Sequence, residues 1–279
     1  MKVVAECYPC LQKLVRQAAE LATGEMPARE RAVAAGLKVL EDNFSLDRVS
    51  IVIAGKLHET VKKKAGNPDP YRAMKQQEIA MAREIYSELA PTPGGDFRAC
   101  LEFAALGNSI DFFRPLEEVK ADMGRRVEFV IDDSAAFASR LPRAGRILYL
   151  ADNAGECFFD LPLVKYLEQF APVTYAVKEE PVQNDLTRAD LEEAGLASAF
   201  RRVITTGSAT PGIDMEQASE EFMEEFGRAD LVVAKGMGYY ESLSELPPQG
   251  RIFYCLMAKC PPVAASLGVP LRSFVAMLR

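Results

Sequence analysis

Histidine is almost absent from this chain of 279 residues, which contains only His58, and long apolar runs are missing altogether. A single histidine argues against histidine-based phosphatase chemistry and against a metal site held by several imidazoles. No apolar stretch approaches the roughly 18 to 20 residues that span a bilayer. The N-terminal residues also lack the apolar centre and cleavage site of a signal peptide. We therefore expect a cytoplasmic protein with no membrane partner.

Cysteines are few, and basic residues are outnumbered by acidic ones. The six cysteines are too scattered for the disulfide framework of a small secreted domain, so we expect reduced thiols. The formal net charge of -7 argues against a nucleic-acid partner, although a local basic pocket for a small phosphate stays possible. With 49% hydrophobic residues the chain can bury a large core or two modest ones.

Glycine-rich phosphate-binding signatures are absent too. The sequence has no GxGxxG after a first strand, no GxxxxGK[ST] loop and no GxSxG elbow. These absences weaken dinucleotide, P-loop and serine-hydrolase interpretations. The "VIDD" run at residues 130–133 has adjacent aspartates, not the DxD spacing common in aspartyl phosphatases.

The N-terminal half shows helical periodicity. Apolar residues recur three or four apart from Cys7 onward, and the pattern predicts further helices after Pro27, from about Leu46, and up to Leu89. The segments "GNPDPY" (66–71) and "PTPGGD" (91–96) interrupt it, because proline disfavours helix continuation. We expect a helical N-terminal region over residues 1–141.

After about residue 142 the period changes. Five short apolar runs, most of them separated by helix-like segments, predict parallel β-α-β units: "RILYLA", "VTYAVK", "RVITT", "DLVVAK" and "RIFYCLMA". We expect a mostly parallel three-layer α/β/α sheet domain over residues 142–279, forming one compact unit with the helical region. Such sheets bind ligands outside the carboxyl ends of their strands.

Polar residues of one chemical kind follow three of these runs. Asp152 and Asn153 follow the first, Asn184 and Asp185 come shortly after the second, and Lys235 ends the fourth. Carboxylate and amide oxygens suit Mg²⁺ or Mn²⁺, and a lysine beside them suits a phosphate. Their joint placement at strand ends predicts a phosphoryl-handling site.

Each of these residues also has an ordinary structural interpretation. Asp152, Asn153 or Asp185 alone could cap a helix or form a turn, and Lys235 alone could be solvated. Asn108 and Asp111 in "GNSIDFF" would share one face of a helical turn, or simply form a capping turn.

Two further candidates lie outside the strand ends. Glu241 could bind a sugar hydroxyl or lie on the surface. Cys7 and Cys10 in "CYPC" have the spacing of half a zinc or redox site, or are structural.

Taken in order, several motifs resemble the damage-control phosphatases, long catalogued as domain of unknown function 89. The motifs span nearly the whole chain: "CYPC", "GNPDPY", "GNSIDF", "LADNAGE", "PVQNDLT", "VVAKGMGYYESLSE" and "MAKCPPVA". The cysteine-containing form is similar to the archaeal and bacterial branch. The combination of "GNSIDF" and "DNAGE" is specific, whereas CxxC alone is not.

The resemblance implies a helical region packed on a three-layer α/β/α unit and a divalent metal, Mn²⁺, Co²⁺, Ni²⁺ or Mg²⁺, at the strand ends. It implies hydrolysis of small phosphorylated metabolites such as sugar phosphates. The matching metal ligands are Asp152, Asn153 and Asp185. Two catalytic roles stay open: Asp152 is the nucleophile and forms an aspartyl phosphate, or Asp152 and Asp185 orient a metal-activated water. Asn108, Asp111 and Lys235 match positions near the phosphate and substrate, and Glu241 keeps its place in the motif.

The chain departs from the family at one motif. "KGMGYYE" stands where a pattern similar to "KGQ(A/G)N(F/Y)E" is expected, so Met237 and Tyr239 replace polar amides. This departure puts the substrate range in question.

Two rival functions stay open on the sequence. One is a metal-binding or redox-sensing protein built around Cys7, Cys10 and Cys260. The other is a nucleotide-cofactor enzyme such as a methyltransferase, because a doubly wound sheet supports many reactions. The oligomeric state is not readable from the sequence.

Overall fold

The structure is a computed structural model that describes residues 1–91, 95–109 and 127–279. Its first three helices, α1 (Cys7–Ala22), α2 (Met26–Asn43) and α3 (Ser50–Ala65), pack around a small core of their own. In α1 the buried residues Cys7, Leu11 and Val15 are four apart and form one apolar face. No helix within the described ranges combines the length and apolar character needed to cross a membrane.

The third helix begins later than its apolar spacing predicts, at Ser50 instead of about Leu46. The backbone just before α3 pairs with the N-terminal segment instead of continuing the helix. The Arg48 carbonyl accepts a hydrogen bond from Val3 at 2.9 Å, and Val49 forms a bridge with Lys2. These contacts tie the N-terminal segment to the start of α3.

The sheet has seven strands in the order β1-β7-β6-β5-β2-β3-β4. The strands are β1 (Phe129–Asp132), β2 (Ile147–Leu150), β3 (Val173–Val177), β4 (Arg202–Thr205), β5 (Leu231–Lys235), β6 (Ile252–Met257) and β7 (Phe274–Leu278). All neighbours are parallel except β6 and β7, which are antiparallel. The expected mostly parallel α/β fold is confirmed.

The five predicted strands correspond to β2 through β6, whereas β1 and β7 were not expected. Both are only partly buried, in contrast to the fully buried β2, β3, β5 and β6. Strand β1 precedes residue 142, the expected start of the α/β part, and joins the sheet through β7. The sheet therefore draws on residues from both sides of that boundary.

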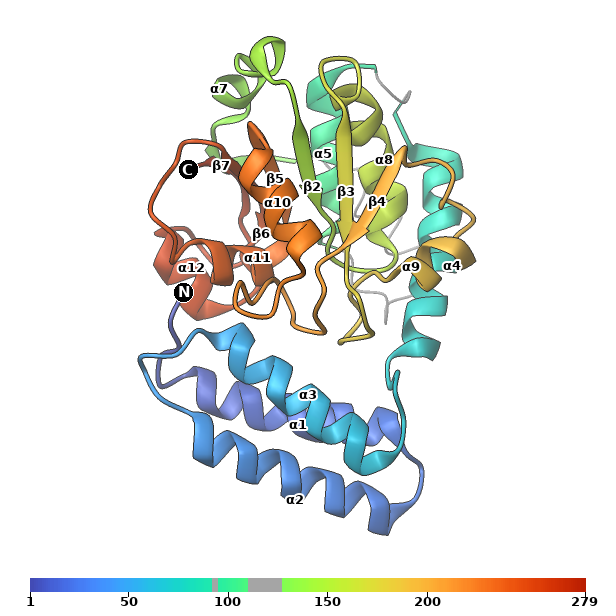
Figure 1. The fold of residues 1–279 in the computed structure, drawn as a ribbon, viewed down its shortest axis with the longest axis vertical. Helices are drawn as coiled ribbons and strands as arrows, with labels where there is room; N and C mark the ends of the chain where they lie inside the picture. Colours follow the sequence, from blue (N-terminus) through green and yellow to red (C-terminus); the bar gives the residue numbers. More distant parts are fainter. Residues whose placement is uncertain (92–94, 110–126) are drawn as a thin grey trace.

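Helices cover both faces of the sheet (Figure 1). One face packs against α4 (Arg72–Leu89), α5 (Phe97–Gly107), α8 (Glu156–Leu167) and the short α7 (Ser134–Ala138). The other packs against α10 (Glu220–Arg228), α11 (Gly236–Leu243) and α12 (Pro261–Leu267). A 3₁₀ turn (Leu141–Arg143) and α9 (Arg188–Glu193) lie in the connections.

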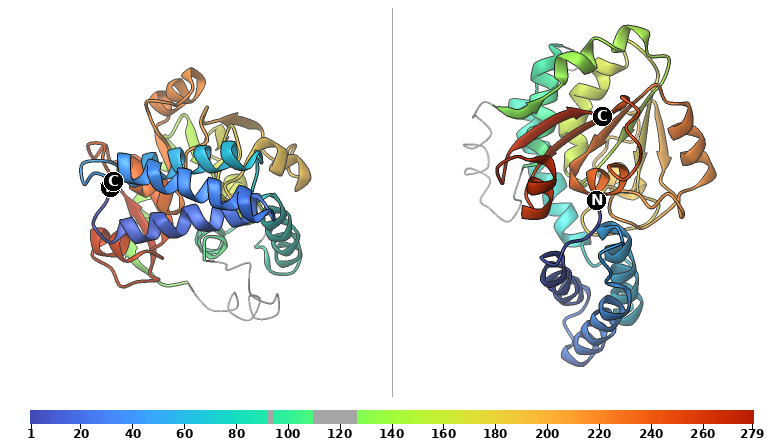
Figure 2. Two further views of the ribbon diagram at one scale, coloured as in Figure 1. Left: turned by 90° about the horizontal axis from the view of Figure 1, so that it is seen from below. Right: turned by 90° about the vertical axis from the view of Figure 1, so that its left-hand side faces the viewer.

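Alternate residues of β2 show why the layers form. Ile147 and Tyr149 belong to the α5 and α8 core, whereas Leu148 and Leu150 belong to the α10 to α12 core. The helices α1 to α3 form a separate layer that projects from one end of this α/β unit (Figure 2). The candidate site lies at this end, between the helical layer and the loops at the strand ends.

Close packing of α5 on α8 gives a test of this architecture. A Cβ at Gly107 would lie 2.7 Å from the Cβ and Cγ of Phe159, whereas a Cβ at Gly227 in α10 would meet nothing within 4 Å. We expect Gly107→Ala to lower the free energy of unfolding by about 1 to 3 kcal/mol through overpacking. Gly227→Ala should raise it by about 0.5 to 1 kcal/mol, because alanine favours helix. Urea denaturation measures both, and equal effects would contradict the packing.

Candidate active site

The candidate site lies where the order of the strands in the sheet reverses, between β2 and β5. Strand β2 continues to β3 on one side and has β5 on the other, which is the switch point where parallel sheets bind ligands. A cavity of about 640 Å³ opens there. Its described lining comes from α1, the α4 region, the end of α5 and the strand-end loops: Leu14, Gln17, Tyr71, Met74, Glu78, Asn108, Ser109, Asp152, Asn153, Gln183, Asn184, Asp185, Pro211, Gly212, Met237, Gly238, Met257, Lys259 and Arg272.

Asp152 stands beside β5 because Gly236 leaves room for it. Gly236 has φ +75°, and a Cβ there would lie 1.9 Å from Asp152 Oδ2. Any side chain at residue 236 would therefore be strained and would displace the carboxylate. Asp152 Oδ2 accepts hydrogen bonds from the side-chain amides of Asn108 at 2.9 Å and Asn153 at 3.3 Å.

Asn153 and Asp185 are joined through their backbones. They form an antiparallel bridge, and the Leu186 N–H donates to the Asp152 carbonyl at 2.8 Å. The Asn153 amide also donates to Glu156 Oε1 at 2.7 Å, which leaves its own oxygen without a donor among the described residues. The structure thus brings together Asp152, Asn153 and Asp185, the three predicted metal ligands.

This donor set fits a divalent cation. Asp185 Oδ2 is buried and has no hydrogen-bond partner among the described residues, although Lys178 Nζ lies 3.4 Å away. Burial raises the pKa of Asp185 to about 6 against the opposing effect of Lys178. Burial, followed by the charges of Glu156 and Asp185, raises the pKa of Asp152 well above its usual range. A cation would relieve this crowding of acidic oxygens.

The two carboxylates of this donor set need the amide oxygen of Asn153 as a third ligand. Within residues 1–91, 95–109 and 127–279, no three His, Cys, Asp or Glu side chains gather as a metal site. Two carboxylates and the Asn153 oxygen form a hard-oxygen set, which is the type that Mg²⁺ and Mn²⁺ prefer.

Lys235 lies beneath the cavity and is not among its described lining residues. It is fully buried, and its ammonium donates to Glu156 Oε2 at 2.9 Å and to Asp160 Oδ1 at 2.6 Å. Burial would lower the pKa of Lys235, but Asp160 and Glu156 raise it above its ordinary value. This arrangement gives the amine a supporting place instead of the expected contact with phosphate.

Two other predicted substrate residues have different positions. Asn108 lies at the cavity, where its amide donates to both Asp152 and Glu156 and its oxygen accepts from the Met257 N–H at 3.0 Å. Glu241 is not among the described lining residues and accepts a hydrogen bond from Ser50 of α3 at 2.6 Å. Asp111 lies outside the described residues.

The sequence prediction missed two cations that line the cavity. Lys259 and Arg272 are exposed there, and neither forms a salt bridge with a described residue. The charge of Lys259 still acts over a longer range on Asp152, Glu156 and Glu78. Arg272 has φ +66° and Gln183 has φ +47°; they are the two described non-glycine residues with left-handed backbone, and both line this cavity. Such strain is concentrated at functional sites.

The motif departure at Tyr239 also has a structural counterpart. Tyr239 is buried, its hydroxyl lies 3.1 Å from Lys178 Nζ, and that ammonium sits 4.3 Å from the ring centroid. The aromatic ring thus holds the lysine that faces Asp185. Met237, at the other departed position, lines the cavity.

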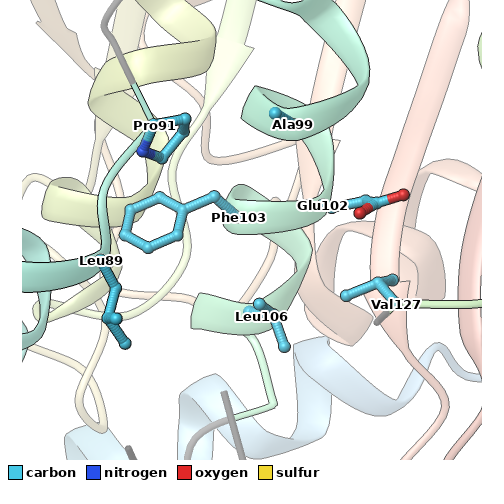
Figure 3. Close-up of a pocket in the computed structure, with 7 residues that line it drawn as sticks. All are labelled: Leu89, Pro91, Ala99, Glu102, Phe103, Leu106 and Val127. Atoms are coloured by element: carbon cyan, nitrogen blue, oxygen red, sulfur yellow. The ribbon is translucent and has the colours of Figure 1, made fainter. Parts of the chain in front are cut away.

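Two other described cavities lack such a donor set. The first, of about 250 Å³, is mostly apolar, with Phe103 between Leu89 and Pro91 (Figure 3). The second, of about 790 Å³, lies between α3 and the loops after β3 and β4. Its lysines and glutamates are mixed, and Lys62 there already donates to the Pro181 carbonyl at 2.8 Å.

The cysteines are not built into the strand-end cavity. Cys7 is buried at the start of α1, Cys10 is exposed, and Cys260 precedes α12. Burial raises the pKa of both Cys7 and Cys260, which disfavours their thiolates. The described residues thus give no structural support to a cysteine-centred metal site.

Comparison with known proteins agrees with the motifs. A family model described as the damage-control phosphatase ARMT1-like domain matches residues 3–275. The chain belongs to this family. A damage-control phosphatase of Pyrococcus horikoshii is 36% identical over 284 residues, which cover 99% of this chain and 98% of that protein. One of Archaeoglobus fulgidus is 30% identical over 287 residues, with 99% of each covered.

A solved structure shows the same relationship. The crystal structure of a DUF89 family protein from P. horikoshii matches with a TM-score of 0.93 and 35% identity, covering 100% of this chain and 99% of that one. The resemblance to the damage-control phosphatases is therefore confirmed, and membership of this family supports a phosphatase function.

The buried lysine beneath the site provides a test of this phosphatase's architecture. Lys235→Met would leave Glu156 and Asp160 buried without their cation, so we expect it to lower the free energy of unfolding by about 3 to 5 kcal/mol. Lys38→Met, which removes the exposed pair with Asp42, should leave the free energy of unfolding nearly unchanged. Urea denaturation of both variants measures the difference. Similar losses would contradict the buried network.

Proposed function

We propose that this phosphatase hydrolyses phosphate monoesters of small metabolites, sugar phosphates among them, with the help of Mn²⁺, Co²⁺, Ni²⁺ or Mg²⁺. The observation that carries the proposal is the meeting of acidic and basic groups in one cavity. Asp152, Asn153 and Asp185 face the same space as Lys259 and Arg272. Oxygen ligands for a metal, beside cations that form no salt bridge with a described residue and can bind a phosphate, are the parts that phosphoryl transfer needs.

Asp152, Asn153 and Asp185 would hold the metal. When bound, the cation would neutralise charge on the phosphoryl oxygens and supply Lewis-acid activation. Lys259 and Arg272 would bind the same phosphoryl group from the other loops. Their positive charge is worth most as negative charge grows on the transferring group.

The protein keeps Asp152 in a fixed orientation. Two amides hold its Oδ2, whereas its Oδ1 accepts no hydrogen bond from the described residues. That oxygen is free either to attack phosphorus, giving an aspartyl phosphate, or to orient an attacking water. Both routes need the same carboxylate position, and both break the bond between phosphorus and the leaving alcohol, which takes up a proton. In the first route, water then hydrolyses the aspartyl phosphate, releases phosphate and regenerates Asp152.

The central carboxylate gives the first test. We expect Asp152→Asn to lower kcat at least about 100-fold on p-nitrophenyl phosphate and on a sugar-phosphate panel, because it removes charge and nucleophilicity but keeps volume. Assays use metal-stripped protein supplied with each of the four metals. Asp47→Asn, at a fully exposed carboxylate, should match the wild type. Well-folded wild type without turnover under any metal would overturn the proposal.

The two cations give a second test. We expect Lys259→Met and Arg272→Met each to raise KM about tenfold and to weaken competitive inhibition by inorganic phosphate, since each removes a charged contact to the phosphoryl group. Lys64→Met, at an exposed lysine in the last turn of α3, is the control and should change neither value. Unchanged phosphate inhibition in both cavity variants would show that phosphate binds elsewhere.

A further inference from the structure

One wall of the cavity carries two buried polar atoms that have no hydrogen-bond partner among the described residues. Glu78 is 2% exposed and Tyr71 is 4% exposed, and both line the cavity. Glu78 Oε1 accepts from the Asn184 amide at 2.8 Å, but Glu78 Oε2 and the Tyr71 hydroxyl have no hydrogen-bond partner in the described protein. Unpaired buried groups are costly, so they call for a partner that the protein alone does not supply.

The two groups lie on the same face of one helix. Tyr71 caps α4 and Glu78 is seven residues later, so about two helical turns separate them. Both positions are held firmly. The Tyr71 ring packs edge to face against His58 at a centroid distance of 5.8 Å, and Glu78 is tied to Asn184. Asn184 directly precedes the candidate metal ligand Asp185, which places this wall beside the reacting end of the cavity.

The chemistry of this wall favours a neutral partner. Burial raises the pKa of Glu78 to about 8, with the Asn184 hydrogen bond acting against it. A carboxyl group that keeps its proton near neutral pH can both donate and accept, as can a tyrosine hydroxyl. A hydroxyl group complements both, whereas an ammonium offers only donors. In the proposed function Lys259 and Arg272 bind the phosphoryl group, so the wall with Tyr71 and Glu78 can contact the alcohol portion of the substrate.

We propose that Tyr71 and Glu78 bind hydroxyl groups of the leaving alcohol and select phosphate esters of polyhydroxy compounds over plain alkyl esters. This inference rests on the proposed phosphatase function and adds the residues that recognise the substrate. Sites that hydrogen-bond a substrate hydroxyl discriminate against analogues without it, because their own buried polar groups are then left unpaired.

The test compares glycerol 3-phosphate with n-propyl phosphate, which share a three-carbon chain and differ by two hydroxyls. We expect the wild type to favour glycerol 3-phosphate in kcat/KM. The ratio of the two values should fall about tenfold in Glu78→Met and about threefold in Tyr71→Phe, as expected for losing hydrogen bonds. Gln77→Met and Tyr86→Phe, on the same helix but away from the cavity lining, should keep the wild-type ratio.

If the two residues had only a structural role, their substitution would lower kcat/KM equally for both substrates and leave the ratio unchanged. That result would overturn the inference. Thermal melts by circular dichroism establish folding. If Glu78→Met does not fold, Tyr71→Phe carries the test through the same ratio. Wild type that hydrolyses p-nitrophenyl phosphate but does not prefer glycerol 3-phosphate overturns this inference alone. Wild type inactive on all three esters overturns the proposed function as well.

Discussion

The site depends on a lysine buried between two carboxylates. Lys235 ends β5 and donates to Glu156 and Asp160 of α8, so one cation ties the sheet to the helix that follows β2. Without it, two acidic groups would be buried without charge compensation. Because the lysine holds Glu156 ionised, Glu156 can accept from Asn108 and Asn153, whose amides also reach Asp152. The network below the cavity thus sets the orientation of the carboxylate that faces it.

Backbone space is the second constraint on the cavity. Gly236 adopts a left-handed backbone and lets Asp152 approach the start of α11. The helical layer then adds a wall to the crevice at the strand ends, since Leu14 and Gln17 of α1 line the same cavity as the strand-end residues. The helical region therefore contributes directly to the site.

Much of this site could be predicted from the sequence because it depends on strand order. Apolar runs locate strand ends, and parallel strands bring Asp152, Asn153 and Asp185 to one edge. What the pattern cannot give is the direction of a side chain at a strand end. Lys235 therefore looked like a phosphate ligand, although it points toward α8. Glu78 and Lys259 depend on long-range packing. A weak signal for Glu78 existed, because Lys75 and Glu78 occupy apolar-face positions of α4 beside Ile79 and Ala82.

The distribution of unfavourable features supports the same location for function. Of the seven buried side-chain atoms that lack a hydrogen-bond partner among the described residues, three belong to Tyr71, Glu78 and Asp185, which all line the strand-end cavity. The left-handed residues Gln183 and Arg272 line it as well. Folding stability alone would favour removing such groups, since each costs about 1 to 3 kcal/mol. Their presence in one cavity, next to the exposed Lys259 and Arg272, is expected if a charged, hydroxyl-bearing ligand supplies the missing contacts.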